Sequence, residues 1–245
     1  MKLTGSPQIF DLDPYANSST QQHNLGAIAI AANGDTYRYT RIISTGTDLI
    51  AGNLHTALAG EANHLNRALG VAGAVGDLSL EVAVGGTQVD ANEYDEGTLA
   101  FNDVSPEGET YYIESHDAST SGSEDVTVRI YPVLKTVATT SSQVELIRNP
   151  WNNPAISQLV TTRAVGVAVQ DWDVSVANFG WLKTRVVAAV LADSTASTIG
   201  HLVAISNQTN GAVGALGTIA QEQQVGQTLG TSIATEFNSV YLTID

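Results

Sequence analysis

The stretch from Asp77 to His116 constrains the fold more than any other part of this chain. It opens with a strict alternation, in which hydrophobic residues occupy every second position from Leu78 to Val84. That period of two is typical of a half-buried β-strand. Gly85-Gly86 then breaks the run where a hairpin needs positive φ. Strand-like pieces at Thr98–Phe101 and Glu109–Ser115 follow, so the stretch predicts a β scaffold without a nucleophile and base.

The composition indicates a folded chain with a weakly charged surface. Hydrophobic residues make up 43% of the 245 residues, and charged residues only 14%. A usual globular protein has about a quarter of its residues charged. The polar surface must therefore consist mainly of hydroxyl and amide side chains, which cost less to desolvate in a subunit contact than ions do.

The charge balance argues against two classes of partner. Ten basic residues stand against 25 acidic ones, which gives a formal net charge of −15. Phosphate backbones and anionic membrane surfaces are bound by clustered lysine and arginine, so neither nucleic acid nor membrane is expected as a partner.

Targeting and redox signals are weak. Cysteine is absent, which leaves no thiolate site and fits assembly in a reducing cytoplasm. The N-terminal stretch lacks a continuous apolar core, so no secretory signal is expected, and no apolar run is long enough to span a bilayer.

The first third of the chain predicts an arm, a hairpin and one ambiguous segment. Residues 1–24 are polar and aperiodic, and we expect an extended arm. Leu25–Ala32 and Thr36–Ile43 flank Asn33-Gly34-Asp35, a strong hairpin signal. Asp48–Leu69 has leucines and alanines near helical spacing but contains two glycines, so a short helix and a covering loop both remain open.

The remaining strands are separated by turn clusters and by one strong break. Asn149-Pro150-Trp151-Asn152-Asn153-Pro154 predicts a domain boundary. We therefore expect an arm at 1–24, a β-sandwich or barrel at 25–150, and a second small β-barrel at 151–245, all antiparallel, with at most one short helix. The further predicted strands are Asp125–Tyr131, Val133–Thr139, Gln143–Arg148, Ala164–Gln170, Gly180–Leu191, His201–Ser206 and Ser239–Asp245.

Candidate chemical sites are all weak. The acidic group from Asp90 to Glu109 could supply oxygen ligands for calcium, but it does not match the EF-hand pattern, and a solvent-facing turn is the favoured interpretation of Glu93–Gly97. The five histidines form no metal-ligand pair, and hydrogen-bonded roles are favoured for them. Neither a nucleophile elbow nor a phosphate-binding glycine loop occurs. We expect neither cofactor, metal nor catalytic residue.

Several short pieces together resemble head decoration (cement) proteins of tailed bacteriophages, over the chain from about Leu25 to the C-terminus. The resemblance rests on Tyr37–Tyr39, Ala51–Leu54, Asn63-His64-x-Asn66, Val89–Gly97, Phe101–Asp103, Gly108–His116, Thr139–Ser142, Asn149-Pro150, Val165–Val167, Phe179–Trp181, Thr235–Phe237 and Leu242–Asp245.

The resemblance implies a non-enzymatic virion protein on the outer capsid surface, assembled in the host cytoplasm. It would clamp neighbouring major capsid protein subunits and form a homotrimer, or alternatively a dimer. The chain is longer than many such proteins, which puts the role of its second half in doubt. We expect the arm and Asp48–Leu69 to reach neighbours, with candidate capsid or subunit contacts at Tyr15, Asn17, Leu49, Leu54, His64, Trp151 and Trp181.

Two other functions fit the same sequence. A carbohydrate-binding adhesive module could use Trp151, Trp172, Trp181 and Phe179, although these aromatic residues are also typical of a core or a subunit interface. A tail or fibre component is the other alternative.

Overall fold

The computed structural model describes residues 13–43, 48–157, 162–172, 179–195, 197–217 and 223–245. It is all-β, as the alternation predicted, and contains two antiparallel sheets. The single helical element in these ranges is the 3₁₀ turn η1 at Ala62–His64. No described helix reaches the length and apolar character that a membrane crossing requires.

The chain forms two compact units, one of which interrupts the other in sequence. Residues 60–149 form what we call the inserted domain, and residues 5–59 with 150–245 form the split domain. The boundary at Pro150 lies inside the predicted Asn149–Pro154 break. The expected 25–150 domain differs from the structure, because β2 pairs with β12 through Arg41 and Phe179.

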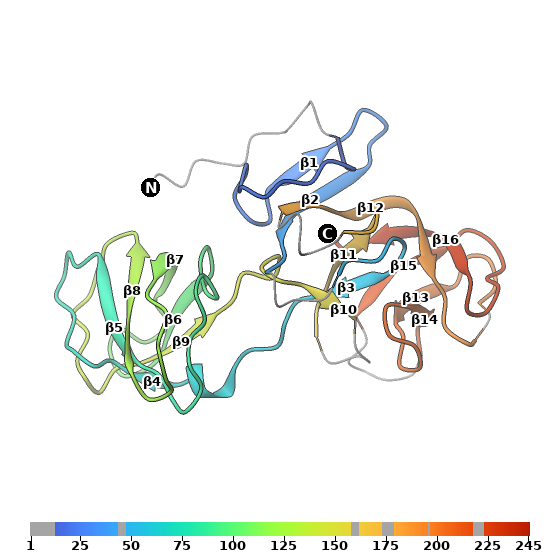
Figure 1. Cartoon of the computed structure of the whole chain (residues 1–245). Coiled ribbons are helices and arrows are strands. Elements are labelled where there is room, and N and C mark those ends of the chain that lie inside the picture. Colours follow the sequence, from blue (N-terminus) through green and yellow to red (C-terminus); the bar gives the residue numbers. More distant parts are fainter. Residues whose placement is uncertain (1–12, 44–47, 158–161, 173–178, 196, 218–222) are drawn as a thin grey trace. The chain divides into compact units, whose positions relative to one another are not determined.

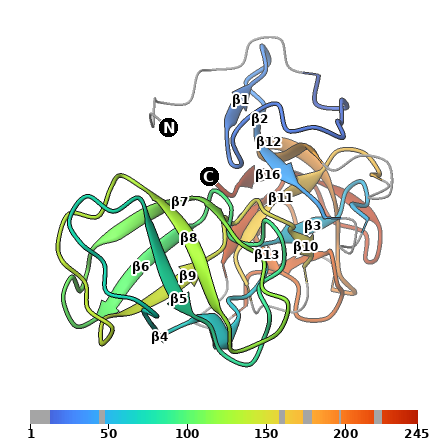
Figure 2. The same cartoon turned by 60° about the vertical axis from the view of Figure 1, so that its left-hand side comes forward.

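The inserted domain is a six-stranded sheet, in the order β4-β9-β6-β7-β8-β5 (Figure 2). Alternating residues of its strands fill one hydrophobic core that includes Leu80, Val82, Leu99, Ile113 and Val128. Its strands are β4 (Arg67–Ala68), β5 (Ser79–Ala83), β6 (Thr98–Asp103), β7 (Thr110–His116), β8 (Asp125–Tyr131) and β9 (Gln143–Ile147).

The split domain is a ten-stranded sheet, in the order β10-β3-β11-β12-β16-β15-β13-β14, with β2 joining β12 to β1 (Figure 1). Its longest strand, β12, pairs with β2, β11 and β16. Its strands are β1 (Ile28–Ile30), β2 (Thr36–Arg41), β3 (Leu54–Thr56), β10 (Ala155–Ile156), β11 (Ala164–Ala168), β12 (Phe179–Leu191), β13 (Leu202–Ile205), β14 (Val213–Ala215), β15 (Gln224–Thr228) and β16 (Phe237–Thr243).

The N-terminal hairpin forms where the sequence predicted it. Strands β1 and β2 pair antiparallel with Ile30 opposite Thr36, and Gly34 has φ +87° in the turn. Tyr37 and Tyr39 are both buried, on the same face of β2. The described part of the predicted arm, residues 13–24, lies against its own domain, because Ser18 bridges to Phe179. The rest of the arm lies outside the described residues.

Two predictions from the Asp77–Asn149 region were wrong. The glycines after β5 do not make a hairpin with the next strand, because β5 pairs with β8, with Val82 opposite Val126. Gly85 instead lies against Asn63, whose backbone oxygen accepts its N–H at 2.7 Å. Val133–Thr139 is not a strand, and its buried residues, Leu134 and Ala138, are four positions apart rather than two.

Candidate functional sites

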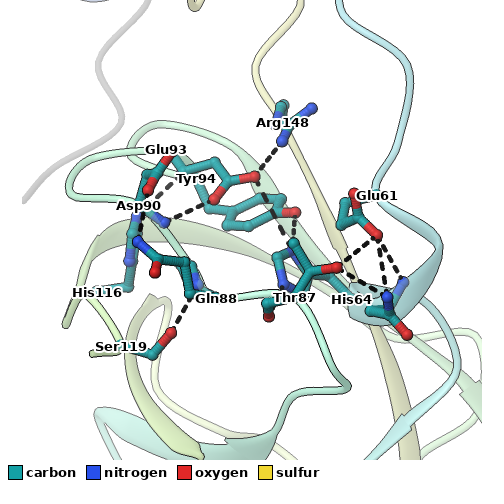
Figure 3. Close-up of polar contacts among 12 residues, drawn as sticks. Glu61, His64, Thr87, Gln88, Asp90, Glu93, Tyr94, His116, Ser119 and Arg148 are labelled. Atoms are coloured by element: carbon teal, nitrogen blue, oxygen red, sulfur yellow. Dashed lines mark hydrogen bonds and ion pairs between the residues drawn. The ribbon is translucent and has the colours of Figure 1, made fainter. Parts of the chain in front are cut away.

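Tyr94 lies at the centre of a buried polar network in the inserted domain (Figure 3). Its ring makes edge contacts with two histidine rings, at centroid distances of 5.6 Å to His64 and 5.8 Å to His116. Its hydroxyl lies 2.6 Å from Nδ1 of His64. Burial, followed by the nearby Glu93 carboxylate, raises the pKa of the Tyr94 hydroxyl, which therefore stays protonated as a donor.

Both histidines use both of their ring nitrogens in hydrogen bonds. Nε2 of His64 lies 3.0 Å from the carbonyl oxygen of Thr87, which can only accept, so Nε2 carries a proton and donates it to that carbonyl. Nε2 of His116 accepts the Tyr94 backbone N–H at 2.9 Å, and its Nδ1 donates to the carbonyl of Asp117 at 2.9 Å. The predicted hydrogen-bonded roles of these two histidines are confirmed.

The acidic turn is part of this network, so the prediction of a solvent-facing turn was wrong. Glu93 forms an ion pair with Arg148, and its Oε1 lies 3.9 Å from Nδ1 of His64. Oδ1 of Asp95 lies 3.7 Å from Nε2 of His116. Tyr94 between these carboxylates is fully buried. These contacts hold the turn against the rest of the inserted domain.

A pocket of about 430 Å³ lies in the split domain. The polar side chains that line it include Asp35, Tyr37 of β2 and Lys183 of β12. The Lys183 ammonium lies 2.7 Å from Oδ2 of Asp35, which also accepts from the Tyr37 hydroxyl at 3.3 Å. Tyr15 and Phe237 line the same pocket, with 62% and 53% of their surface exposed.

The inserted domain carries an exposed apolar surface on two neighbouring segments. The segments are joined by paired backbone hydrogen bonds between Gly73 and Ala138, both at 3.0 Å. The exposed side chains, which we call the inserted-domain surface, are Val71, Val75, Leu78 and Val137, between 47% and 60% exposed. The charged residues of residues 71–78 and 133–138 are Asp77 and Lys135, which balance one another.

The split domain carries a comparable surface across four strands and the residue after β14. Val187 on β12 lies opposite Tyr241, Tyr241 opposite Gln227, and Gln227 opposite Leu202. The row continues to Leu216, whose N–H donates to the carbonyl of Leu202. Val187, Tyr241, Leu202 and Leu216, between 37% and 44% exposed, form what we call the split-domain surface. No residue of this row is charged.

The seven candidate contact residues differ in how much of their surface is exposed. Tyr15 and Asn17 are exposed, and Trp151 is half-buried with the Arg38 guanidinium 4.8 Å from its ring centroid. The other four have at most 5% of their surface exposed, so the prediction that their side chains contact a partner does not fit the folded chain. These four are Leu49, Leu54, His64 and Trp181.

The aromatic residues proposed for sugar binding lie mostly in the core. Trp172 and Trp181 are 2% and 5% exposed, and Trp181 packs against Tyr39 at a centroid distance of 5.0 Å.

Within the described ranges, no group of three or more histidine, aspartate or glutamate side chains is placed to hold a metal ion. The Lys183–Asp35 pair could not be predicted from the sequence, because the two residues meet only through the pairing of β2 with β12 in the sheet.

Comparison with models of known protein families, with curated proteins and with solved structures finds no match for this chain.

Proposed function

We propose that this chain is a non-enzymatic structural protein of a tailed-bacteriophage virion, a decoration protein on the outer surface of the capsid. It binds major capsid protein subunits and ties neighbouring subunits together. The proposal starts from the resemblance carried by the sequence. The observation that supports it most is that each of the two domains has its own exposed apolar surface.

The charge of these surfaces supports a role in protein contact. The chain has a net charge of −15, yet neither surface has net negative charge. Burial of aliphatic and tyrosine side chains is favourable, and the central part of a protein interface is usually poor in charge. A partner can therefore dock on either surface without desolvating carboxylates.

Two surfaces on one chain suit a cementing role. When one surface is bound, the second meets its site at a high effective concentration, and the two contacts reinforce each other. Binding that exists only in the assembled lattice stabilises that lattice by linkage. The described residues of the arm, including exposed Tyr15 and Asn17, add polar surface for a neighbouring copy or a capsid subunit.

The experiment is reconstitution onto particles that lack the protein. We expect the chain to co-sediment with expanded capsids in a fixed ratio to the capsid subunit and to raise their survival on heating. Val75→Asp and Leu202→Asp each place a charge on one apolar surface and should weaken binding at least tenfold. Combining them should abolish co-sedimentation.

The control variants carry the same change outside the two surfaces. Ile147 of β9 and Ile30 of β1 are 43% and 38% exposed, and Ile147→Asp and Ile30→Asp should leave binding unchanged. The proposal fails if the unmodified chain does not bind capsids, or if particles with and without it survive heating equally. Equal losses in the control and surface variants would remove the assignment of the two surfaces.

A further inference from the structure

We propose that the pocket of the split domain binds a neutral saccharide ring, held by the Lys183–Asp35 pair and by the exposed ring of Phe237. This activity goes beyond the proposed capsid role and does not depend on it. The pocket's volume of about 430 Å³ falls in the usual range for small-molecule sites.

The polar side chains that line the pocket are buried. Lys183, Asp35 and Tyr37 are 7%, 8% and 5% exposed. Oδ2 of Asp35 accepts from Lys183 at 2.7 Å, from Tyr37 at 3.3 Å and from Asn33 Nδ2 at 3.0 Å. Oδ1 of the same carboxylate has no hydrogen bond to any described residue, and an ammonium has three N–H donors. The pair therefore offers both an acceptor and donors to a ligand.

Two exposed aromatic side chains, Phe237 and Tyr15, also line the pocket. Phe237 lies against the backbone of Gly52, where an added Cβ would come within 2.5 Å of two ring carbons. The ring thus packs against Gly52 on one side, while 53% of the surface of Phe237 stays exposed. Tyr15 also lines the pocket, and its carbonyl accepts from the Gln170 amide at 2.6 Å.

The chemistry of these groups selects the class of ligand. The ion pair has no net charge, so neither a simple anion nor a simple cation gains from it. A wholly apolar ligand would cover buried donors and acceptors without satisfying them, which costs free energy. Adjacent hydroxyls of a sugar accept from the ammonium and donate to the carboxylate, while the C–H face of the ring packs on Phe237 and Tyr15.

The test is saturation-transfer NMR on the full-length protein. The probes are the methyl glycosides of glucose, galactose, mannose and N-acetylglucosamine, with benzamide as a non-sugar probe that also donates and accepts. We expect transfer to the ring C–H protons of at least one glycoside. Phe237→Ala, at an exposed side chain, should reduce this signal several-fold without unfolding the domain.

Two further variants separate the site from a surface effect. Asp35→Asn combined with Lys183→Met removes both charges together and should abolish transfer. Tyr241→Ala removes an exposed aromatic ring from the same strand as Phe237 but does not line the pocket, so the glycoside signal should persist. Under the proposed capsid role, that same Tyr241 variant should weaken capsid binding, so the two proposals can fail separately.

Three outcomes overturn the inference. They are transfer to none of the four glycosides, transfer to benzamide alone, and glycoside transfer that survives either Phe237→Ala or the combined Asp35→Asn and Lys183→Met change. Tryptophan fluorescence confirms that each variant is folded, because all three tryptophans belong to the split domain.

Discussion

Replacing His55 with glutamine tests whether a buried neutral imidazole makes the split domain sensitive to acid. His55 lies in β3 with none of its surface exposed. Its Nδ1 lies 2.9 Å from the carbonyl oxygen of Asn53, and its Nε2 has no hydrogen-bond partner. Burial lowers the pKa of this imidazole from 6.5 to about 4, against a smaller opposite effect of the Asn53 contact. The folded domain therefore disfavours the protonated ring.

The size of the effect follows from proton linkage. Between the two pKa values the unfolded chain binds a proton that the folded chain does not, so the free energy of unfolding falls as the pH falls. The slope is about 1.4 kcal/mol per pH unit. When the pH falls from about 7.5 to about 4.5, His55 should lower the free energy of unfolding of the split domain by about 2.5 kcal/mol. Glutamine does not titrate, and its side-chain amide can replace the donor to Asn53.

The assay is urea unfolding at a series of pH values. Tryptophan fluorescence isolates the split domain, because Trp151, Trp172 and Trp181 all belong to it. The contributions of all other titrating groups to the pH dependence cancel when the variant is subtracted from the original chain. His201→Gln is the matched control, since this exposed histidine lies in the same domain.

The reasoning is refuted if the original chain and His55→Gln lose stability in parallel as the pH falls. A difference of the same size in His201→Gln would also refute it, because an exposed imidazole carries no burial cost.

Three further changes test the packing of each domain. Gly97→Ala puts a Cβ within 2.8 Å of two backbone oxygens, and this overpacking should lower the free energy of unfolding of the inserted domain by at least about 2 kcal/mol. Its control is Gly86→Ala, whose added Cβ has no heavy atom within 4 Å and which should be nearly neutral. Far-UV circular dichroism melts measure both variants. Tyr94→Phe leaves Nδ1 of His64 without its hydrogen-bond partner and should lower the free energy of unfolding by about 1–3 kcal/mol in the same melts. Gly226→Ala meets a backbone oxygen at 2.2 Å and should lower the urea midpoint of tryptophan fluorescence without affecting the inserted domain.

Strands with local signals were predicted well. Asp125–Tyr131 alternates between apolar and polar residues and forms β8 with the predicted bounds. The Asn33-Gly34-Asp35 turn likewise produced the β1–β2 hairpin. In both cases the pattern that defines the strand lies within a few residues, so no knowledge of distant partners was needed.

Features that depend on distant partners could not be predicted. The domain division failed because nothing in residues 25–59 indicates that β2 pairs with β12. Short strands such as β3 and β15 lie in glycine-rich or ambiguous sequence and are formed by their neighbours in the sheet. The acidic turn looked solvated because its partners, the buried His64 and the half-buried Arg148, are far away in the sequence.

The insertion of one domain into the other has a consequence for synthesis on the ribosome. Every strand partner of the inserted domain is present once Asn149 has been made. The split domain has to wait, because β12 is flanked by β2 from the start of the chain and by β16 from its end. β3 lacks its later partners until Ala168 has been made, β2 lacks its later partner until Arg185 has been made, and β12 lacks β16 until Thr243 has been made. The order of translation therefore favours completion of the inserted domain first, with the two halves of the split domain joining last.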